Sequence, residues 1–339
     1  MAEARILITG GCGFVGQHLV HALSQSLPEA KLVVVDLKPS PFPVHDLSAL
    51  TGVELHVGVD ILDSAAMSPL MAGVDQVIHL AGIVSFSLKA RKQLEAVNVG
   101  GAEAVARAAL EARVRQVVQV SSVAALGYND DAANPIDETH DFDWREAYRR
   151  RKYYMISKHR ADEVMGAYRR RGLPVVTVYP GLIMGPGDHC NTVKMLRPIM
   201  QGKASFALPG GTNIVDVRDV TRGIVELVTR GFTSGSYLLS GHNMSSMEII
   251  RTIVGQAGGK VPRRTLPRFM RWPLYQLALL GERLAPHLTG ITADNVDSSF
   301  KYRYFSHDLA TRTFGWHPEI SFAQSVSDTV AWLRQHELL

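Results

Sequence analysis

The first half of the chain alternates between short, uncharged apolar runs and stretches whose apolar residues recur at helical spacing. Apolar runs of this length, bounded by turn-forming residues, are typical of strands buried on both faces. Six such runs predict strands, at residues 5–9, 31–36, 54–61, 75–82, 115–122 and 174–181. Helical spacing follows at 17–23, 94–112 and 149–171. Strands and helices in this order predict an α/β fold with a doubly wound parallel sheet.

The pattern becomes irregular beyond Gly181. Short strands are expected at the start of 213–220 and at 235–241, and helices at 246–257, 272–284 and 322–334, while the polar residues 128–147 predict a long surface loop. We therefore place a domain boundary at this point. Residues 1–181 are expected to form the parallel-sheet domain, and residues 182–339 a smaller C-terminal region with some segments returning to the first domain.

The composition and charge are typical of a soluble globular protein, with 46% hydrophobic residues, 20% charged residues and a net charge of +4. The arginine clusters lack the aromatic residues of a nucleic-acid surface, so we expect no nucleic-acid partner. The 2 cysteines are far apart in sequence, which favours a reducing compartment over a disulfide framework. The sequence predicts no signal peptide, and it has no run of 18 apolar residues that would predict a membrane-spanning helix. These features predict a cytoplasmic protein, and we expect no metal site.

Three glycines follow the first predicted strand, at Gly10, Gly13 and Gly16, and Phe14 and Val15, which lie between the last two, are expected to contact the cofactor. Gly10 permits a backbone angle closed to other residues, Gly13 lets the main chain approach a pyrophosphate, and Gly16 lets the helix pack closely on the strand. The N-terminus of the helix offers unpaired N–H groups and a positive dipole end to phosphates. The turn is predicted to bind a dinucleotide; a tight turn without a ligand is the alternative.

Asp36 ends the second strand about 20 residues beyond the glycines, where an acid can accept hydrogen bonds from the adenosine ribose. Its charge would repel a 2′-phosphate, so NAD is expected as the cofactor. Lys38 leaves NADP open, and a strand-end aspartate in a turn is the alternative interpretation of Asp36. Asp60 is expected at the edge of the adenine. Other positions at strand ends are expected to contact the cofactor, namely Ile61, Leu80, Ala81, Gly82, Ser121, Pro180 and Gly181.

Tyr154 and Lys158 are four residues apart on a predicted helix, so their side chains share a face. A nearby lysine favours the phenolate and brings the tyrosine pKa toward the working range of a general base. Ser122, at the carboxyl end of a strand, can hold a substrate oxygen. Tyr148 and Lys152 have the same spacing but lie in a run of four cations, which predicts a wet surface. For any single pair of this kind, a surface contact is the alternative.

Together these residues resemble the extended short-chain dehydrogenase/reductase superfamily. The opening Thr9-Gly10-Gly11-Cys12-Gly13-Phe14-Val15-Gly16 is similar to its T-G-x-x-G-x-x-G motif, and Tyr154-Met-Ile-Ser-Lys158 to its Y-x-x-x-K motif. Matching motifs also occur at 79–82, 98–101 and 121–122. The resemblance covers nearly the whole chain, and implies a Rossmann fold whose C-terminal region mainly binds substrate.

The resemblance implies a role for each catalytic candidate. Tyr154 would give or take the proton, Lys158 would hold the nicotinamide ribose and lower the tyrosine pKa, and Ser122 would bind the reacting oxygen. Asn98, buried on the pattern without an obvious local partner, would support a water-linked proton relay, or else cap a turn. Tyr179 departs from the family, in which many extended members have arginine at this position.

The second half of the chain resembles the branch with 3β-hydroxysteroid dehydrogenases, sterol-carboxylate dehydrogenases and dihydroflavonol reductases. The similar segments are 213–220 (N-I-V-D-V-R-D-V), 301–306 and 314–318. The implied activity is NAD-dependent hydride transfer between the cofactor and a secondary alcohol or ketone with an apolar, steroid-like or aromatic, body. A nucleotide-sugar epimerase or dehydratase without net redox is the first alternative, and a non-enzymatic NAD sensor is the second. A homodimer is usual in the superfamily.

Two further sets of residues are candidates for substrate or surface contacts. Positions expected near the substrate are Ser85, Phe86, Met184, His189, Cys190 and Met195. The segment 266–288 is rich in leucine and aromatic residues and is bracketed by arginines. It is predicted either to rest on a membrane surface, making the protein membrane-associated, or to close over an apolar substrate, or to be a plain packing helix.

Overall fold

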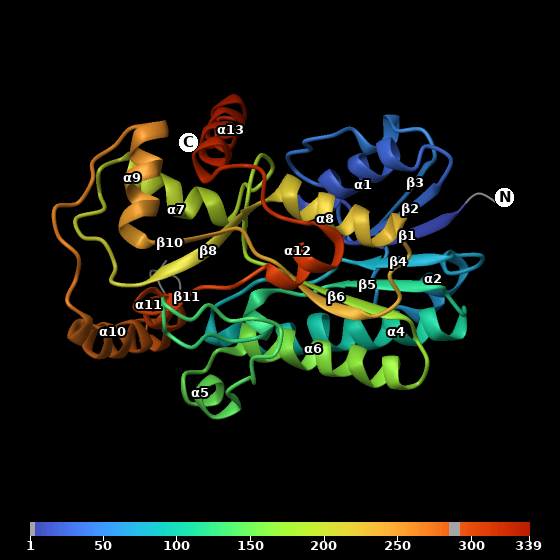
Figure 1. Cartoon of the computed structure of the whole chain (residues 1–339), viewed down its shortest axis with the longest axis horizontal. Helices are drawn as coiled ribbons and strands as arrows, with labels where there is room; N and C mark the ends of the chain where they lie inside the picture. The colour runs from blue at the N-terminus through green and yellow to red at the C-terminus, as the bar shows by residue number, and fades with distance from the viewer. Residues whose placement is uncertain (1–3, 285–291) are drawn as a thin grey trace.

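A computed structural model describes residues 4–284 and 292–339, and its centre is a seven-stranded, wholly parallel sheet (Figure 1). The strand order is β3-β2-β1-β4-β5-β6-β9. The strands are β1 Arg5–Thr9, β2 Lys31–Asp36, β3 Val53–Val57, β4 Gln76–His79, β5 Gln116–Val120, β6 Val175–Pro180 and β9 Gly235–Leu239. The order reverses between β1 and β4, which confirms the predicted doubly wound Rossmann sheet.

Helices cover both faces of this sheet (Figure 1). On one face lie α1 Phe14–Ser26, α8 Val217–Thr229 and α12 Asp308–Phe314, and on the other α2 Ser64–Leu70, α4 Gly101–Glu111 and α6 Tyr153–Arg170. Each face has its own cluster of buried apolar side chains. Burial on both faces explains why the strands are continuous apolar runs without alternation.

The C-terminal region adds a small second sheet, in which β8 lies between β10 and β11 and also pairs with β7. The strands are β7 Leu182–Met184, β8 Gly211–Asp216, β10 His242–Ser245 and β11 Tyr302–Arg303. The helices are α7 Asn191–Met200, α9 Ser246–Ala257, α10 Arg271–Leu284, α11 Ala293–Ser299 and α13 Phe322–Gln335. Because β9 joins the main sheet and α8 packs on α1, later segments also build the first part of the molecule. The domain boundary at residue 181 stays a prediction.

Several element boundaries differ from those that the sequence predicts. The helix expected at 94–112 consists of α3 Arg91–Leu94, a π-helical turn Glu95–Gly100, and α4. The loop expected at 128–147 contains the start of α5 Trp144–Arg149, because Asp143 caps that helix by accepting a hydrogen bond from Glu146 N at 2.8 Å. The next helix begins at Tyr153 and not at Arg149, because Arg151 has a φ of 56° and interrupts it.

Short helical turns complete the chain, at Leu47–Ala49, Leu88–Ala90, Val123–Ala125 and Arg268–Met270. The strand predicted at 54–61 ends at Val57, because Gly58 turns the backbone with a φ of 88°. In the ranges 4–284 and 292–339, no helix has the length and apolar character needed to cross a bilayer.

Candidate active site

The glycine turn between β1 and α1 has the geometry of a phosphate cradle. Gly10 has a φ of 72°, and a Cβ there would come within 2.7 Å of Ala81 N. A Cβ on Gly16 would overlap the Gly10 carbonyl oxygen, so the helix packs directly against the turn. Gly13 is exposed, and α1 begins immediately after it at Phe14, with no side-chain cap and no acid in its first turn. The N–H groups at this helix end therefore suit the pyrophosphate of a dinucleotide.

Asp36 lies beside this turn, at the end of β2. Its carboxylate accepts hydrogen bonds from Cys12 N at 3.0 Å and Lys38 N at 3.4 Å. Its carbonyl oxygen accepts from Val59 N at 3.1 Å, which brings the segment with Asp60 next to it. Asp60 is exposed and Ile61 is buried. The acid and the glycine turn are thus brought together as the sequence predicts, and its contact with a ribose stays a prediction.

The segment after β4 closes over the glycine turn. Leu80 N donates to Thr9 O at 3.1 Å, and the Thr9 hydroxyl lies 2.7 Å from Nδ1 of His79. Burial lowers the pKa of His79 to about 3, so this imidazole is neutral. The contact between Thr9 and His79 was not found by the sequence analysis, although both residues end neighbouring strands. Leu80, Ala81 and Gly82 follow directly, in position to border the cofactor.

Asn98 is buried and joins two parts of the site. Its amide accepts from Ile83 N at 2.8 Å and donates to Ile83 O at 3.1 Å and to the Ser157 hydroxyl at 3.0 Å. It occupies the π-helical turn, an irregularity frequently found at functional sites. Asn98 thus fastens the segment after β4 to α6. Its role in a proton relay stays a prediction.

The phenol of Tyr154 meets the Ser122 hydroxyl at the carboxyl edge of the sheet. Burial raises the pKa of Tyr154, the hydrogen bond with Ser122 lowers it, and the charge of Asp162 raises it further. The net direction is upward, opposite to the lowering expected from Lys158. The ring of Phe86 lies edge-on to that of Tyr154, with 5.6 Å between centroids. The structure therefore brings Tyr154, Ser122 and Phe86 together, and the expected lowering of the Tyr154 pKa was wrong.

Lys158 extends from the same helix face toward the end of β5. Its Nζ donates to the carbonyl oxygen of Val120 at 3.2 Å, and burial lowers its pKa. Among residues 4–284 and 292–339, none forms an ion pair with it within 4.0 Å. This ammonium keeps donors available for another group, as the ribose-holding role requires.

Asp162, one helical turn beyond Lys158, is a site residue that the sequence analysis missed. Its Oδ2 accepts from the Ser121 hydroxyl at 2.9 Å, and it is also hydrogen-bonded to Tyr179, while Oδ1 has no partner among the described residues. Burial raises its pKa to about 7. The signal was available, because Tyr154, Lys158 and Asp162 succeed each other at intervals of four on one helix.

The two residues of the alternative pair, Tyr148 and Lys152, lie in different environments in the structure. Tyr148 is exposed, as predicted, but Lys152 has 0% exposure, so its placement on a wet surface was wrong. Its ammonium lies 2.8 Å from Asp294 and 3.0 Å from Asp297 and donates to the Ser298 hydroxyl at 2.7 Å. Burial opposes the charge, but these carboxylates together with Tyr128 raise the pKa of Lys152. These partners lie more than a hundred residues away in sequence, so no local sequence pattern could predict them.

The remaining candidates divide between the site and the C-terminal core. Pro180 ends β6, and Gly181, which follows it, packs so closely on Asn213 that a Cβ would overlap it. Ser85 lies next to Phe86. Met184 is 1% exposed within the C-terminal core, and Met195 packs against that core. His189 contacts the ring of Phe42 at 5.3 Å, and Cys190 is exposed. Only Phe86 of this set contacts Tyr154 directly.

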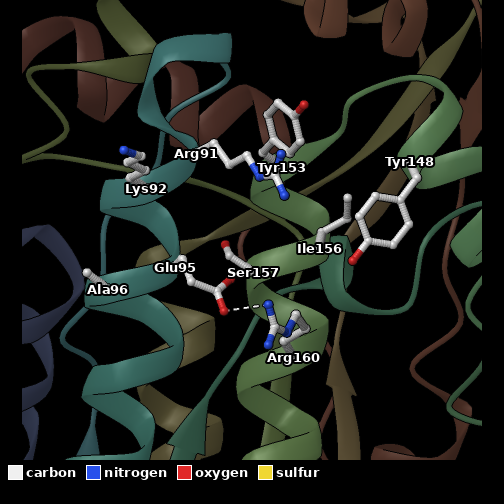
Figure 2. Close-up of a pocket in the computed structure, with 9 residues that line it drawn as sticks. All are labelled: Arg91, Lys92, Glu95, Ala96, Tyr148, Tyr153, Ile156, Ser157 and Arg160. Carbon is white, nitrogen blue, oxygen red and sulfur yellow. Dashed lines mark ion pairs between the residues drawn. The ribbon is translucent and has the colours of Figure 1, made fainter.

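A separate cavity of about 370 Å³ lies between α6 and the helical segment 91–100 (Figure 2). It is lined by Arg91, Lys92, Glu95, Ala96, Tyr148, Tyr153, Ile156, Ser157 and Arg160. Figure 2 shows Glu95 and Arg160 joined by an ion pair across it. None of the residues predicted for the cofactor or the substrate lines this cavity. In the described part of the chain, no group of three or more histidine, cysteine or acidic side chains could hold a metal ion.

Known proteins resemble this chain over its whole length. It is 28% identical to sterol demethylase protein B of Methylococcus capsulatus, with 98% of this chain and 99% of that protein covered. It is 26% identical to a 3-beta-hydroxysteroid dehydrogenase of Mycolicibacterium neoaurum, covering 97% and 91%. The crystal structure of gox2253 superposes with a TM-score of 0.80 at 29% identity, covering 99% and 100%.

The family model for NAD dependent epimerases and dehydratases matches residues 6–239, which include the glycine turn, Ser122, Tyr154 and Lys158. The members of this family are enzymes that act on small molecules. The chain therefore belongs to the NAD dependent epimerase/dehydratase family of extended short-chain dehydrogenases/reductases, and its cofactor is NAD.

Proposed function

We propose that this protein is an oxidoreductase that transfers a hydride between NAD and a secondary alcohol or ketone on an apolar, steroid-like or aromatic, substrate. The observation that carries the proposal is the hydrogen bond of Tyr154 to Ser122, with Lys158 one helical turn away. A phenol and a hydroxyl can share a single substrate oxygen, which is what removal or delivery of an alcohol proton requires. This arrangement also argues against a protein that only senses NAD.

The residues around the glycine turn would hold the cofactor. Main-chain N–H groups at Gly13 and the start of α1 would bind the pyrophosphate, and Asp36 would accept from the adenosine ribose. Lys158 would hold the nicotinamide ribose with its remaining donors. When bound, NAD supplies the acceptor or donor of hydride; the protein supplies position and the proton.

Tyr154 would hold the proton at its phenolic oxygen. In the reducing direction it gives that proton to the carbonyl oxygen, while Ser122 donates a hydrogen bond to the same atom. In the oxidising direction the phenolate takes the proton of the alcohol. The raised pKa of Tyr154 keeps the phenol protonated at neutral pH, which is the form that reduction needs.

Two observations support an apolar substrate. The phenyl ring of Phe86 borders Tyr154 and is 36% exposed, so it offers an apolar surface next to the reacting atoms. Two full-length relatives have names that refer to sterols or steroids. The residue Tyr179, which replaces the arginine of many extended members, is buried and hydrogen-bonded to Asp162 and Ser236, so it offers no cation to a nucleotide sugar.

A screen of purified protein with NAD and NADH tests the proposal. We expect a change in NADH absorbance with a hydroxysteroid, an aryl alcohol or the matching ketone, and none with Tyr154→Phe protein. Turnover of a UDP-sugar without a change in absorbance would instead identify an epimerase or dehydratase. Calorimetric titration with NAD and NADP tests Asp36, and we expect tighter binding of NAD, with Asp36→Ala reducing the difference.

The homodimer and the cytoplasmic location are further proposals from the family resemblance. Sedimentation equilibrium of the full chain measures the first, with a dimer as the expected result. Cell fractionation measures the second.

A further inference from the structure

The helix α10 exposes a row of large apolar side chains to solvent, while Tyr275 and Glu282 face the protein interior. Trp272, Leu277, Leu280 and Leu284 are between 52% and 76% exposed. A surface helix of a globular protein normally has the opposite arrangement, with apolar residues packed inward. Figure 1 shows α10 at an outer edge of the molecule beside α11. Packing through Tyr275 alone does not account for these exposed apolar side chains.

Polar contacts on the inner side hold the helix in this orientation. Arg271 donates to Asp297 at 2.7 Å from the start of α10. Near its end, the buried carboxylate of Glu282 accepts from Ala293 N at 2.9 Å and from Leu88 N at 3.4 Å. Turning the apolar side inward would break these contacts and bury the apolar side chains against charged groups. The outward apolar face is therefore a fixed feature of the fold.

The exposed apolar side chains of the protein are concentrated here. Phe269, immediately before α10, is 76% exposed. Among the described residues, the four most exposed large hydrophobic side chains are Phe269, Leu284, Trp272 and Leu277. We call Phe269, Trp272, Leu277, Leu280 and Leu284 the α10 patch. An apolar surface of this concentration marks an interaction site.

The charges of the segment that carries the patch are almost all positive. Between residues 258 and 284 the sequence has six cations, at Lys260, Arg263, Arg264, Arg268, Arg271 and Arg283, and one acid, Glu282, which is buried. Arg268 and Arg271 are paired with aspartates of the protein. Arg263, Arg264 and Arg283 are exposed, and no residue that the structure describes forms an ion pair with them.

We propose that the α10 patch docks on the surface of an anionic phospholipid bilayer, with its apolar side chains at the acyl boundary and the unpaired arginines among the headgroups. Aromatic and leucine side chains beside free cations are the composition of a helix that lies in the membrane interface. A second copy fits less well, because a two-fold contact would place this cationic region against itself. Of the predicted segment 266–288, residues 285–288 lie outside the described residues. The proposal is independent of the enzymatic activity.

Co-sedimentation of the full chain with vesicles tests the proposal. We expect the protein to pellet with vesicles that contain phosphatidylglycerol, to pellet much less with pure phosphatidylcholine, and to be released by salt. Trp272→Gln with Leu280→Gln should lower the bound fraction about ten-fold or more, since two buried apolar side chains are lost. Arg263→Gln with Arg264→Gln should weaken only the binding that depends on phosphatidylglycerol.

A matched control replaces two exposed apolar residues far from the patch, Leu55→Gln with Val57→Gln on β3, and should bind vesicles like the parent. Circular dichroism and the melting temperature of every variant confirm that it is folded. Equal pelleting of the Trp272/Leu280 variant and the parent would overturn the proposal. So would a parent that ignores vesicles but forms dimers that this variant abolishes, which would assign the patch to a second copy.

Discussion

Two tyrosine–lysine pairs with the same four-residue spacing, Tyr148/Lys152 and Tyr154/Lys158, follow each other along this chain. Their side chains lie in different environments. In the first, the tyrosine is exposed and the lysine is neutralised in the interior by Asp294 and Asp297. In the second, the tyrosine meets Ser122, and the lysine donates only to a backbone carbonyl. A lysine whose charge is compensated by carboxylates stabilises the fold, whereas a lysine with unused N–H donors can bind a ligand.

Removing the two phenol oxygens gives the largest expected contrast. Tyr154→Phe should lower kcat/KM by about 10²–10⁴-fold, because it removes the group that moves the proton. Tyr148→Phe removes an exposed hydroxyl and should leave kcat/KM unchanged. Steady-state kinetics on the substrate found in the screen measure both. Equal activities of the two variants would remove the distinction between the pairs.

Removing the two ammonium groups should reverse the contrast when stability is measured. Lys152→Met leaves the buried Asp294 without its cation and removes one of the cations of Asp297, so it should lower the free energy of unfolding by about 3–5 kcal/mol. Lys158→Met breaks no ion pair within 4.0 Å among the described residues and loses only the attraction of Asp162, so it should abolish activity with a smaller loss of stability. Urea denaturation of both variants at neutral pH measures the difference. A similar loss for both would show that Lys158 also has a structural charge partner.

Asp162 allows a test of the electrostatic environment of the second pair, Tyr154 and Lys158. Its pKa is raised from 3.8 to about 7 in the folded protein, so folding binds its proton more tightly and its contribution to stability falls as pH rises between those values. The Asp162→Asn variant has no carboxyl group to titrate at this position. Its stability relative to the parent should therefore increase as the pH rises from about 5 to about 8, by roughly 1–3 kcal/mol.

Melting temperatures across this pH range measure the difference between the Asp162→Asn variant and the parent. The neighbouring Glu163→Gln, at an exposed position of α6, is the matched control and should show no such trend. A constant difference between Asp162→Asn and the parent would mean that Asp162 is ionised throughout the range.

Ser122→Ala should have the smallest effect on the pair. Its hydrogen bond lowers the pKa of Tyr154, so its loss should move the pH profile of oxidation to higher pH. The pH dependence of kcat/KM measures this shift. A profile that keeps its position while the rate falls would assign Ser122 to substrate binding alone.

The local chemistry of the site could be predicted from the sequence because it depends on short-range spacing. Strand, glycine turn and helix are neighbours in sequence, and the carboxyl ends of parallel strands meet at one edge of a sheet. Asp36 accordingly lies beside the glycine turn, and Ser122 beside Tyr154. The helix boundary at Tyr153 was misplaced, because the left-handed conformation of Arg151 has no signature such as glycine.

By itself, then, the sequence determined the parallel sheet, the glycine turn and the helix that presents Tyr154, since each follows from a local period or a residue's own backbone preference. Only the tertiary structure decided which lysine is compensated, since Lys152 finds its carboxylates on α11, 142 and 145 residues further along the chain. It alone also decided that α10 faces solvent with its apolar side. Amphipathic spacing predicts that a helix has two faces, but the buried partners of Arg271 and Glu282 determine which face points inward.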